Sequence, residues 1–237
     1  MPIIDPPDAR SIMAIAAHPD DIEAWCAGTL AGAMDRGATV RLLLVTSGDK
    51  GSGDPTADAR AVAMRREAEA IAAARLLGIA EVAFLRYTDG EVENTQPLLR
   101  DIVGGIRRWQ PEIVFTFDPE HPLPRYISHR DHRTVGRATL DAIFPLARDP
   151  LAFPQQVRDG LPTHKVGAIW LFASAVADAY VDISATFERK ITARLAHISQ
   201  TADPAALPAR FRTRDSAAGA PVGLPLAEAF TIVTIGR

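Results

Sequence analysis

The alternation of short apolar runs with longer helix-like segments is the feature that most constrains the fold of this chain. Runs rich in branched apolar residues are typical of buried strands, and they occur at 12–17, 40–45, 82–85, 113–117, 169–172, 180–183 and 230–233. Helix-like segments lie between most of them, at 24–36, 58–77, 97–109, 131–147 and 186–199. Strands that alternate with helices in this way build a parallel sheet with helices on both faces. The sequence therefore predicts an α/β protein with a doubly wound, mostly parallel sheet.

Length and charge narrow the class of protein. We expect a single domain over 1–237, with a mobile loop at about 201–225, where Ala, Pro, Arg and Gly follow no clear period. A net charge of -3 gives no electrostatic reason to bind nucleic acid or an anionic membrane. Cys26 is the only cysteine, and no run approaches the ~18 apolar residues of a membrane span. With no signal-peptide pattern at the start, these features predict a cytoplasmic protein.

One strand-to-helix turn concentrates polar side chains. His18, Asp20 and Asp21 follow the apolar run 12–17 directly and precede the helix-like segment 24–36. In a doubly wound sheet, ligands bind at the edge where the carboxyl ends of the strands lie. A single aspartate at such a turn is most simply a helix cap, because the first amides of a helix attract a carboxylate. An imidazole with two carboxylates also suits a divalent metal ion with a spare carboxylate as base.

A second cluster, with His129, Asp131 and His132, follows the run 113–117. The runs 12–17 and 113–117 are expected to end at the same edge of the sheet, so the two clusters can meet. Two histidines and one carboxylate form a common catalytic zinc set, and zinc lowers the pKa of a bound water to about 7. A further carboxylate could take the water proton, and a further histidine could stabilise an oxyanion. From the residues alone, a metal site and simple helix capping therefore both remain open explanations of the clusters.

These motifs are similar to those of the LmbE-like, or PIG-L, family of metal-dependent N-deacetylases. The sequence reads A-H-P-D-D at 17–21 and H-R-D-H, an H-x-D-H motif, at 129–132. Further pieces resemble the family in order along roughly the first 200 residues, at 46–51, at Arg66 with Glu69, at 87–90, and at Lys190 with 197–200. Ala27 and Arg130 depart from the family pattern, which often has Gly and Pro there. The resemblance implies a Rossmann-like sheet and hydrolysis of an amide.

The family resemblance also implies roles for the first cluster. His18, Asp21 and His132 would bind Zn²⁺, although the same donors accept Fe²⁺ or another divalent ion. Asp20 would be the general base that activates the attacking water. Adjacent carboxylates would thus have different duties, since Asp21 holds the metal and Asp20 moves the proton.

The remaining roles concern the oxyanion and the substrate. His129 would stabilise the oxyanion or assist the leaving amine, with Asp131 orienting it or setting its charge. Arg66 and Asp89 match positions that face the sugar in relatives. The expected partner is a small N-acetylated sugar or conjugate, and the chain could also form a homo-oligomer.

We therefore expect zinc-dependent removal of an N-acetyl group from a glucosamine-like sugar or conjugate, releasing acetate and a free amine. Two alternatives stay open: an amidase of the same family acting on a thiol-sugar conjugate, and a sugar- or metabolite-binding module without turnover. A nicotinamide-dependent oxidoreductase has only the fold class in its favour, because the run 12–17 leads to His-Pro-Asp-Asp and not to a glycine fingerprint. His121 is expected on a loop lip, and His197 near a helix end, where a cation interacts favourably with the dipole.

Overall fold

The computed structural model describes residues 2–120 and 127–236. Within these residues, eight strands form one sheet in the order β1-β7-β8-β6-β5-β2-β3-β4. The strands are β1 (Ile3–Ile4), β2 (Ser11–Ala16), β3 (Thr39–Thr46), β4 (Glu81–Tyr87), β5 (Ile113–Phe117), β6 (Ala168–Phe172), β7 (Ala179–Asp182) and β8 (Ala227–Thr234).

The sheet is mostly parallel, as the sequence predicts. β2 pairs in parallel with β3 and β5, and further parallel pairs join β3 to β4, β5 to β6 and β1 to β7. Only β8, among the described strands, runs antiparallel to its neighbours β6 and β7. β2 is apolar and fully buried from Ile12 to Ala16, because both of its faces are covered. Since β2 to β6 run in the same direction, their carboxyl ends share one edge of the sheet.

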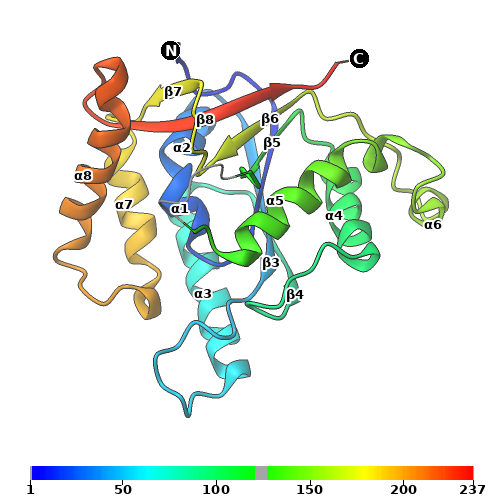
Figure 1. Ribbon diagram of the computed structural model, residues 1–237, viewed down its shortest axis with the longest axis horizontal. Coiled ribbons are helices and arrows are strands. Elements are labelled where there is room, and N and C mark those ends of the chain that lie inside the picture. Colours follow the sequence, from blue (N-terminus) through cyan, green and yellow to red (C-terminus); the bar gives the residue numbers. More distant parts are fainter. Residues whose placement is uncertain (1, 121–126, 237) are drawn as a thin grey trace.

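Helices cover both faces of this sheet, and Figure 1 shows α7 and α8 on one side with α4 and α5 on the other. α7 packs against α1, α2, α3 and α8, while α4 packs against α5. The helices are α1 (Asp21–Trp25), α2 (Ala27–Asp35), α3 (Ala59–Leu77), α4 (Gln96–Trp109), α5 (Arg130–Ile143), α6 (Pro154–Arg158), α7 (Phe187–Leu195) and α8 (Leu207–Gly219). Short 3-10 turns are η1 (Leu146–Arg148), η2 (Ile198–Gln200) and η3 (Ala220–Val222). The predicted α/β class is therefore confirmed.

The first helical segment differs from the continuous helix predicted at 24–36. It begins earlier, at Asp21, and is interrupted at Cys26, whose φ of -144° is not helical. The interruption gives α2 its own N-terminus, and the first amides there are bound by a distant carboxylate. Gly28 N and Thr29 N donate to the two oxygens of Glu228 at 3.0 and 2.7 Å. The helix therefore restarts where a buried anion satisfies its free N–H groups.

The segment 201–225, for which the sequence predicts a loop, contains α8 and η3 instead. The prediction of an irregular segment was wrong over α8 because the helix is stabilised by tertiary contacts and not by its own apolar period. Leu207, Asp215 and Gly219 are buried, and α8 packs against β8. Asp215 pairs with Lys190 at 2.8 Å. Because α8 has few apolar residues on the face that packs against the protein, its sequence gives only a weak indication of a helix.

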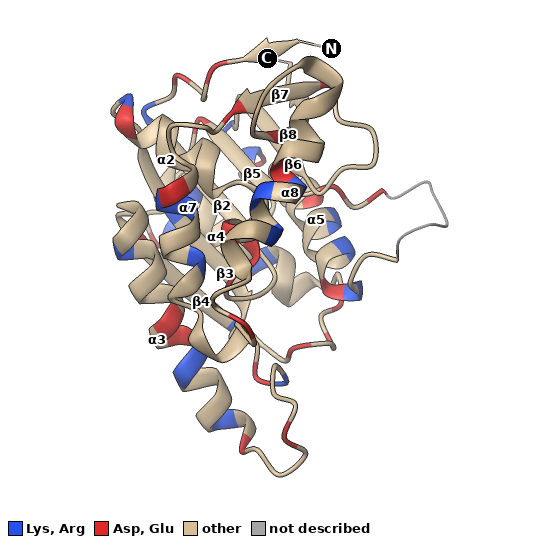
Figure 2. Ribbon diagram, turned by 90° about the vertical axis from the view of Figure 1, so that its left-hand side faces the viewer, with Lys and Arg blue, Asp and Glu red and all other residues tan. Residues whose placement is uncertain are grey.

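The connection between α5 and β6 is organised by one buried arginine. Arg107, on α4, is 1% exposed and donates hydrogen bonds to backbone carbonyl oxygens of the segment that contains η1 and precedes α6: Leu146, Ala147, Asp149, Ala152 and Phe153. A planar guanidinium with five donors suits this arrangement. Elsewhere, acidic and basic residues are mixed over the helices in the view of Figure 2. No helix in the described part of the chain is both long enough and apolar enough to cross a membrane.

Candidate active site

The turn after β2 places His18, Asp20 and Asp21 at the carboxyl edge of the sheet. Asp20 has φ 98° and ψ -10°, in the left-handed region that a non-glycine residue rarely adopts. This conformation reverses the chain so that α1 can begin at Asp21. The Asp21 carboxylate then accepts a hydrogen bond from the backbone N–H of His18 at 2.7 Å, which closes the turn. Strain of this kind is characteristic of functional sites.

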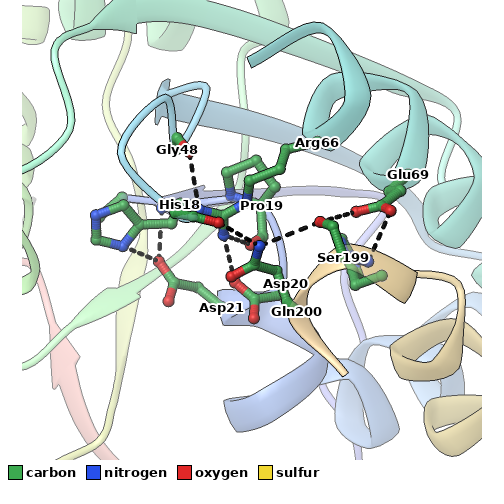
Figure 3. A network of polar contacts seen from close by, with 12 residues as sticks. His18, Pro19, Asp20, Asp21, Gly48, Arg66, Glu69, Ser199 and Gln200 are labelled. Carbon is green, nitrogen blue, oxygen red and sulfur yellow. Dashed lines mark hydrogen bonds and ion pairs between the residues drawn. The ribbon is translucent and has the colours of Figure 1, made fainter. Parts of the chain in front are cut away.

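The three predicted metal ligands, His18, Asp21 and His132, lie close together. His18 Nδ1 lies 3.2 Å from His132 Nε2 and 3.5 Å from Asp21 Oδ2, and His132 Nε2 lies 3.1 Å from Asp21 Oδ1. His132 belongs to α5, which follows β5, so the two strand ends bring the clusters together as the topology predicts. The His132 ring stacks on Phe117 with a centroid distance of 4.0 Å, which fixes its plane. Figure 3 shows His18 and Asp21 facing each other.

The opposite nitrogen of His18 faces two further carboxylates. Nε2 is 3.1 Å from Asp89 Oδ1 and 3.3 Å from Asp131 Oδ2. Asp131 Oδ2 also accepts a hydrogen bond from Gly90 N at 2.6 Å. His18 is therefore shared by several donor sets, and two of these have ligand atoms within 4.8 Å of one another: His18 with Asp89 and Asp131, and His18 with His129 and His132.

The site stabilises positive charge strongly. Burial lowers the pKa of His18, but its contacts with Asp131, Asp21 and Asp89 outweigh burial and raise the pKa to about 12. Burial raises the pKa of Asp21, but His132 and His18 outweigh this and hold it well below its usual range. Carboxylates and imidazoles that hold a proton this tightly also suit a divalent cation, which competes with that proton for the same lone pairs.

Asp20 stands apart from these donor sets. Its carboxylate is 3.1 Å from Arg66 Nη2 and 3.3 Å from Arg194 Nη2. Burial and the neighbouring charge of Asp21 raise the pKa of Asp20, and the two arginines with His197 oppose that shift. The side chain is 22% exposed, so a small molecule can reach it.

Arg66 is buried beneath the glycine-containing loop that follows β3. It donates to the carbonyl oxygens of Pro19 and Gly48 at 2.7 and 3.1 Å. Gly48 has φ 64°, and a Cβ there would lie 2.1 Å from Arg66 Nη1, so only glycine lets the guanidinium occupy this space. The predicted contact of Arg66 with a sugar stays a prediction, because its observed partners are protein groups. Asp89, the other predicted sugar contact, lies against His18.

His129 is the N-cap of α5, and its Nδ1 accepts a hydrogen bond from Asp131 N at 3.2 Å. The backbone of Asp131 thus contacts His129, while the Asp131 carboxylate contacts His18. Whether Asp131 also sets the charge of His129 stays a prediction. Burial lowers the pKa of His129, and so do the nearby His18 and His132 rings. His129 is exposed, and its ring lies edge-on to that of His18 with a centroid distance of 4.7 Å. Its side chain therefore contacts the site on one side and solvent on the other.

His197 and Arg130 contact other protein groups. His197 is fully buried beyond the end of α7, with Nε2 3.4 Å from the buried Glu23 carboxylate. Arg130 donates to the Gly90 carbonyl oxygen at 3.0 Å. His121, expected on a loop lip, lies outside the described residues. Sequence reasoning missed Arg194, since its only signal was a position near the 197–200 motif.

The sequence of the chain is similar to those of known deacetylases. The family model described as PIG-L, GlcNAc-PI de-N-acetylase, matches residues 13–143, more than half of the chain. A diacetylchitobiose deacetylase of Thermococcus kodakarensis is 32% identical over 193 residues, covering 81% of this chain and 71% of the relative. A probable N-acetyl-α-D-glucosaminyl L-malate deacetylase 2 of Bacillus cereus is 30% identical over 201 residues, covering 81% and 84%.

A solved structure extends the similarity over nearly the whole fold. N,N'-diacetylchitobiose deacetylase from Pyrococcus horikoshii, complexed with its inhibitor MPG, matches with a TM-score of 0.89 and 29% identity. The match covers 96% of this chain and 85% of that chain. The motifs at 17–21 and 129–132, the parallel sheet and these matches all lead to one conclusion. The chain belongs to the PIG-L, or LmbE-like, family of deacetylases.

Proposed function

We propose that the protein is a zinc-dependent hydrolase that removes the N-acetyl group of a glucosamine-like sugar or sugar conjugate. The observation that supports this most is the arrangement around Asp20. This accessible carboxylate lies beside the converging side chains of His18, Asp21 and His132 but belongs to none of their mutual contacts. Metal ligands with a separate carboxylate and an exposed imidazole, His129, suit metal-assisted hydrolysis of an amide.

Among the donor sets that share His18, we propose His18, Asp21 and His132 as the ligands. A metal-bound histidine commonly donates its other ring N–H to a carboxylate. His18 Nε2 has such partners in Asp89 and Asp131, which leaves the Nδ1 lone pair directed to the other two ligands. Mixed nitrogen and oxygen donors of this kind suit zinc. A divalent ion bound there supplies a Lewis acid that polarises the acetyl carbonyl and acidifies the attacking water.

Asp20 carries out the proposed proton transfers, and His129 stabilises the negative charge that develops on the acetyl oxygen. Asp20 takes the proton of the water that attacks the acetyl carbon, and its raised pKa brings it closer to that of an effective base. Because His129 Nδ1 accepts the Asp131 N–H, the neutral ring carries its proton on Nε2. That proton can form a hydrogen bond to the acetyl oxygen as negative charge develops. When the C–N bond breaks, Asp20 returns the proton to the amine, and acetate is released.

The sugar as substrate rests on the named relatives, which are deacetylases of diacetylchitobiose and of an N-acetylglucosaminyl malate. Asp89 and Arg66 remain the proposed sugar contacts. An amidase acting on a thiol-sugar conjugate would use the same site with a larger acyl group. A sugar- or metabolite-binding module without turnover is disfavoured, because the chain has the proposed metal ligands, the proposed base and the proposed oxyanion donor together.

Release of acetate from a panel of N-acetylated sugars and conjugates, with the zinc-loaded protein, tests the proposal. Asp20→Asn should keep its zinc and lose about 10²- to 10⁴-fold in kcat. Asp35→Asn is a matched control, because Asp35, the last residue of α2, is exposed and pairs with Arg189 of α7. Full activity of Asp20→Asn with zinc bound contradicts the base assignment. Release of a larger acid identifies an amidase, and sugar binding without metal or turnover identifies a binding module.

A further inference from the structure

The Asp20 carboxylate lies between two guanidinium groups. Arg66 Nη2 is 3.1 Å from Oδ1 and Arg194 Nη2 is 3.3 Å from Oδ2, so each oxygen faces one arginine. The two arginine side chains are only 5% and 11% exposed, against 22% for Asp20. Two largely buried cations therefore hold a carboxylate that stays partly accessible.

Arg194 is itself held in place by the segment after its helix. It lies in the last turn of α7, where Nη1 donates to Thr201 Oγ1 at 3.0 Å and Nη2 to the Gln200 carbonyl oxygen at 3.2 Å. These bonds use the fork of the guanidinium in a way that a lysine cannot reproduce. Arg194 lies beyond residue 143, where the family-model match ends, so that match assigns it no role.

The turn η2 that orders Arg194 is tied to α3, as Figure 3 shows for its labelled residues. Ser199 N and Oγ donate to the Glu69 carboxylate at 2.8 and 2.6 Å, and Gln200 Nε2 donates to the Gly51 carbonyl oxygen at 2.9 Å. Glu69 lies three residues after Arg66, on the same side of the helix. α3 thus supplies one arginine to Asp20 and anchors η2, whose Gln200 accepts a hydrogen bond from the other.

Asp20 requires such support for two reasons. Its backbone has a φ of 98°, which is unfavourable for a residue with a side chain. Its neighbour Asp21 carries the same charge, so the two carboxylates repel each other. Without Arg194, one carboxylate oxygen would lose its partner, and the side chain could rotate away from the attacking water.

We propose that Arg194 is a positioning residue, which holds the Asp20 carboxylate in the orientation from which it takes the water proton. The inference rests on the proposed function, because it assigns Arg194 an effect only through the base. A misplacement of about 1 Å can reduce the rate of a reaction on the order of 100-fold. Arg194 is therefore expected to affect kcat and neither metal binding nor KM.

The first test is Arg194→Met, which keeps the length of the side chain and removes its charge and donors. We expect kcat for acetate release to fall about 10- to 100-fold, with KM and bound zinc unchanged. Arg194→Lys should restore part of the loss, because the ammonium can still reach Asp20. Arg189→Met is the matched control on α7, since its guanidinium pairs with Asp35 away from the site. Circular dichroism and thermal unfolding show whether each variant is folded.

A double-mutant cycle separates positioning from a general loss of structure. In the Asp20→Asn background, Arg194→Met should cost less than threefold in residual rate, because the base on which it acts is already absent. An equal loss in both backgrounds would show that Arg194 acts independently of Asp20 and would overturn the inference. If Arg194→Met does not fold, the same comparison with Arg194→Lys decides.

The outcomes distinguish this inference from the proposed function. Inactive Asp20→Asn beside fully active Arg194→Met would refute the role of Arg194 and leave the base assignment intact. Fully active, zinc-bound Asp20→Asn would refute the base assignment, and the role of Arg194 would fall with it.

Discussion

Two groups of buried charged residues in this molecule differ in how completely their charges are paired by other protein groups. In the Lys190 cluster, which is Lys190, Asp215 and Glu228, the ammonium lies 2.8 and 2.7 Å from the two carboxylates. All three side chains are at most 3% exposed. Glu228 also binds the first amides of α2, and Asp215 binds Arg214 at 2.8 Å. Each charge is paired by protein groups, and the cluster joins α2, α7, α8 and β8.

The site cluster, by contrast, has more carboxylate than the protein itself balances. Its members are His18, Asp20, Asp21, Asp89, Asp131 and His132, with Arg66 and Arg194 as the arginine partners of Asp20. Without a metal, protonation of His18, whose pKa is raised to about 12, offsets only part of this excess. The side chains of Asp20 and His132 are 22% and 14% exposed. The comparison teaches that a closed, balanced cluster holds a fold together, whereas an open, acidic one is suited to bind a cation.

The largest expected effect comes from removing a proposed ligand from the site cluster. Asp21→Ala should lose stoichiometric zinc and at least about 10⁴-fold in kcat/KM, because the metal chemistry and its charge stabilisation go together. Metal analysis of the purified protein and acetate release measure the two losses. The exposed Asp35→Ala should change neither. An Asp21→Ala protein with full zinc content would contradict the ligand assignment.

Breaking the Lys190 cluster should affect stability instead. Lys190→Met leaves two buried carboxylates without their shared cation and should lower the free energy of unfolding by about 3–5 kcal/mol. Urea denaturation measures this change. Lys50→Met is the control, because Lys50 pairs with Glu91 on the surface and should contribute nothing measurable. If the folded Lys190→Met protein lost zinc affinity as well, the two clusters would not be separable in function.

Zinc should stabilise the native state through the site cluster alone. At a free zinc concentration 100 times the Kd, binding should add about 2.7 kcal/mol to the free energy of unfolding. The shift in Tm on adding zinc or a chelator measures it. His132→Ala should lose this shift, whereas Lys190→Met, although less stable, should retain it. The same zinc shift in His132→Ala would place the metal elsewhere.

The smallest effect should be a pH dependence of the metal-free protein. Burial raises the pKa values of Asp89 and Asp131, but contacts with His18 outweigh burial and lower both. Their contribution to stability is therefore present above the usual value of 3.8 and is lost as the pH falls below it. The matching contribution of His18 is present below pH 6.5 and is lost as the pH rises through about 12. Asp131→Asn should show a shallower loss of stability in acid, as measured by urea denaturation.

The sequence predicted those parts of the fold and the site that depend on residues close together in the chain. The turn with His18 and Asp21 and the start of α5 with His132 depend on residues close together in the chain. Parallel topology then places both turns at one edge. α8 was not predictable, because its stability comes from contacts with β8 and α7 and its own apolar pattern is weak.

Arg107 and Arg108 show that the surroundings of a single residue also depend on tertiary contacts. They are identical neighbours on α4, yet Arg107 is buried among backbone carbonyl groups and Arg108 is exposed. Likewise, nothing local marks Arg194 as a partner of Asp20. Their contact depends on how α7 packs beside α1 and on the anchoring of η2 to α3.

The sequence by itself determined the alternating α/β architecture, the two polar clusters and the kind of chemistry that their donors can perform. These follow from periodicity, turn-forming residues and side-chain type, which are properties of short segments. Only the tertiary structure decided that Asp131 contacts His18 through its carboxylate, that Glu228 and Lys190 form a closed cluster, and that two arginines hold Asp20. Those contacts join residues far apart in the chain, and the packing of whole helices against the sheet sets their distances.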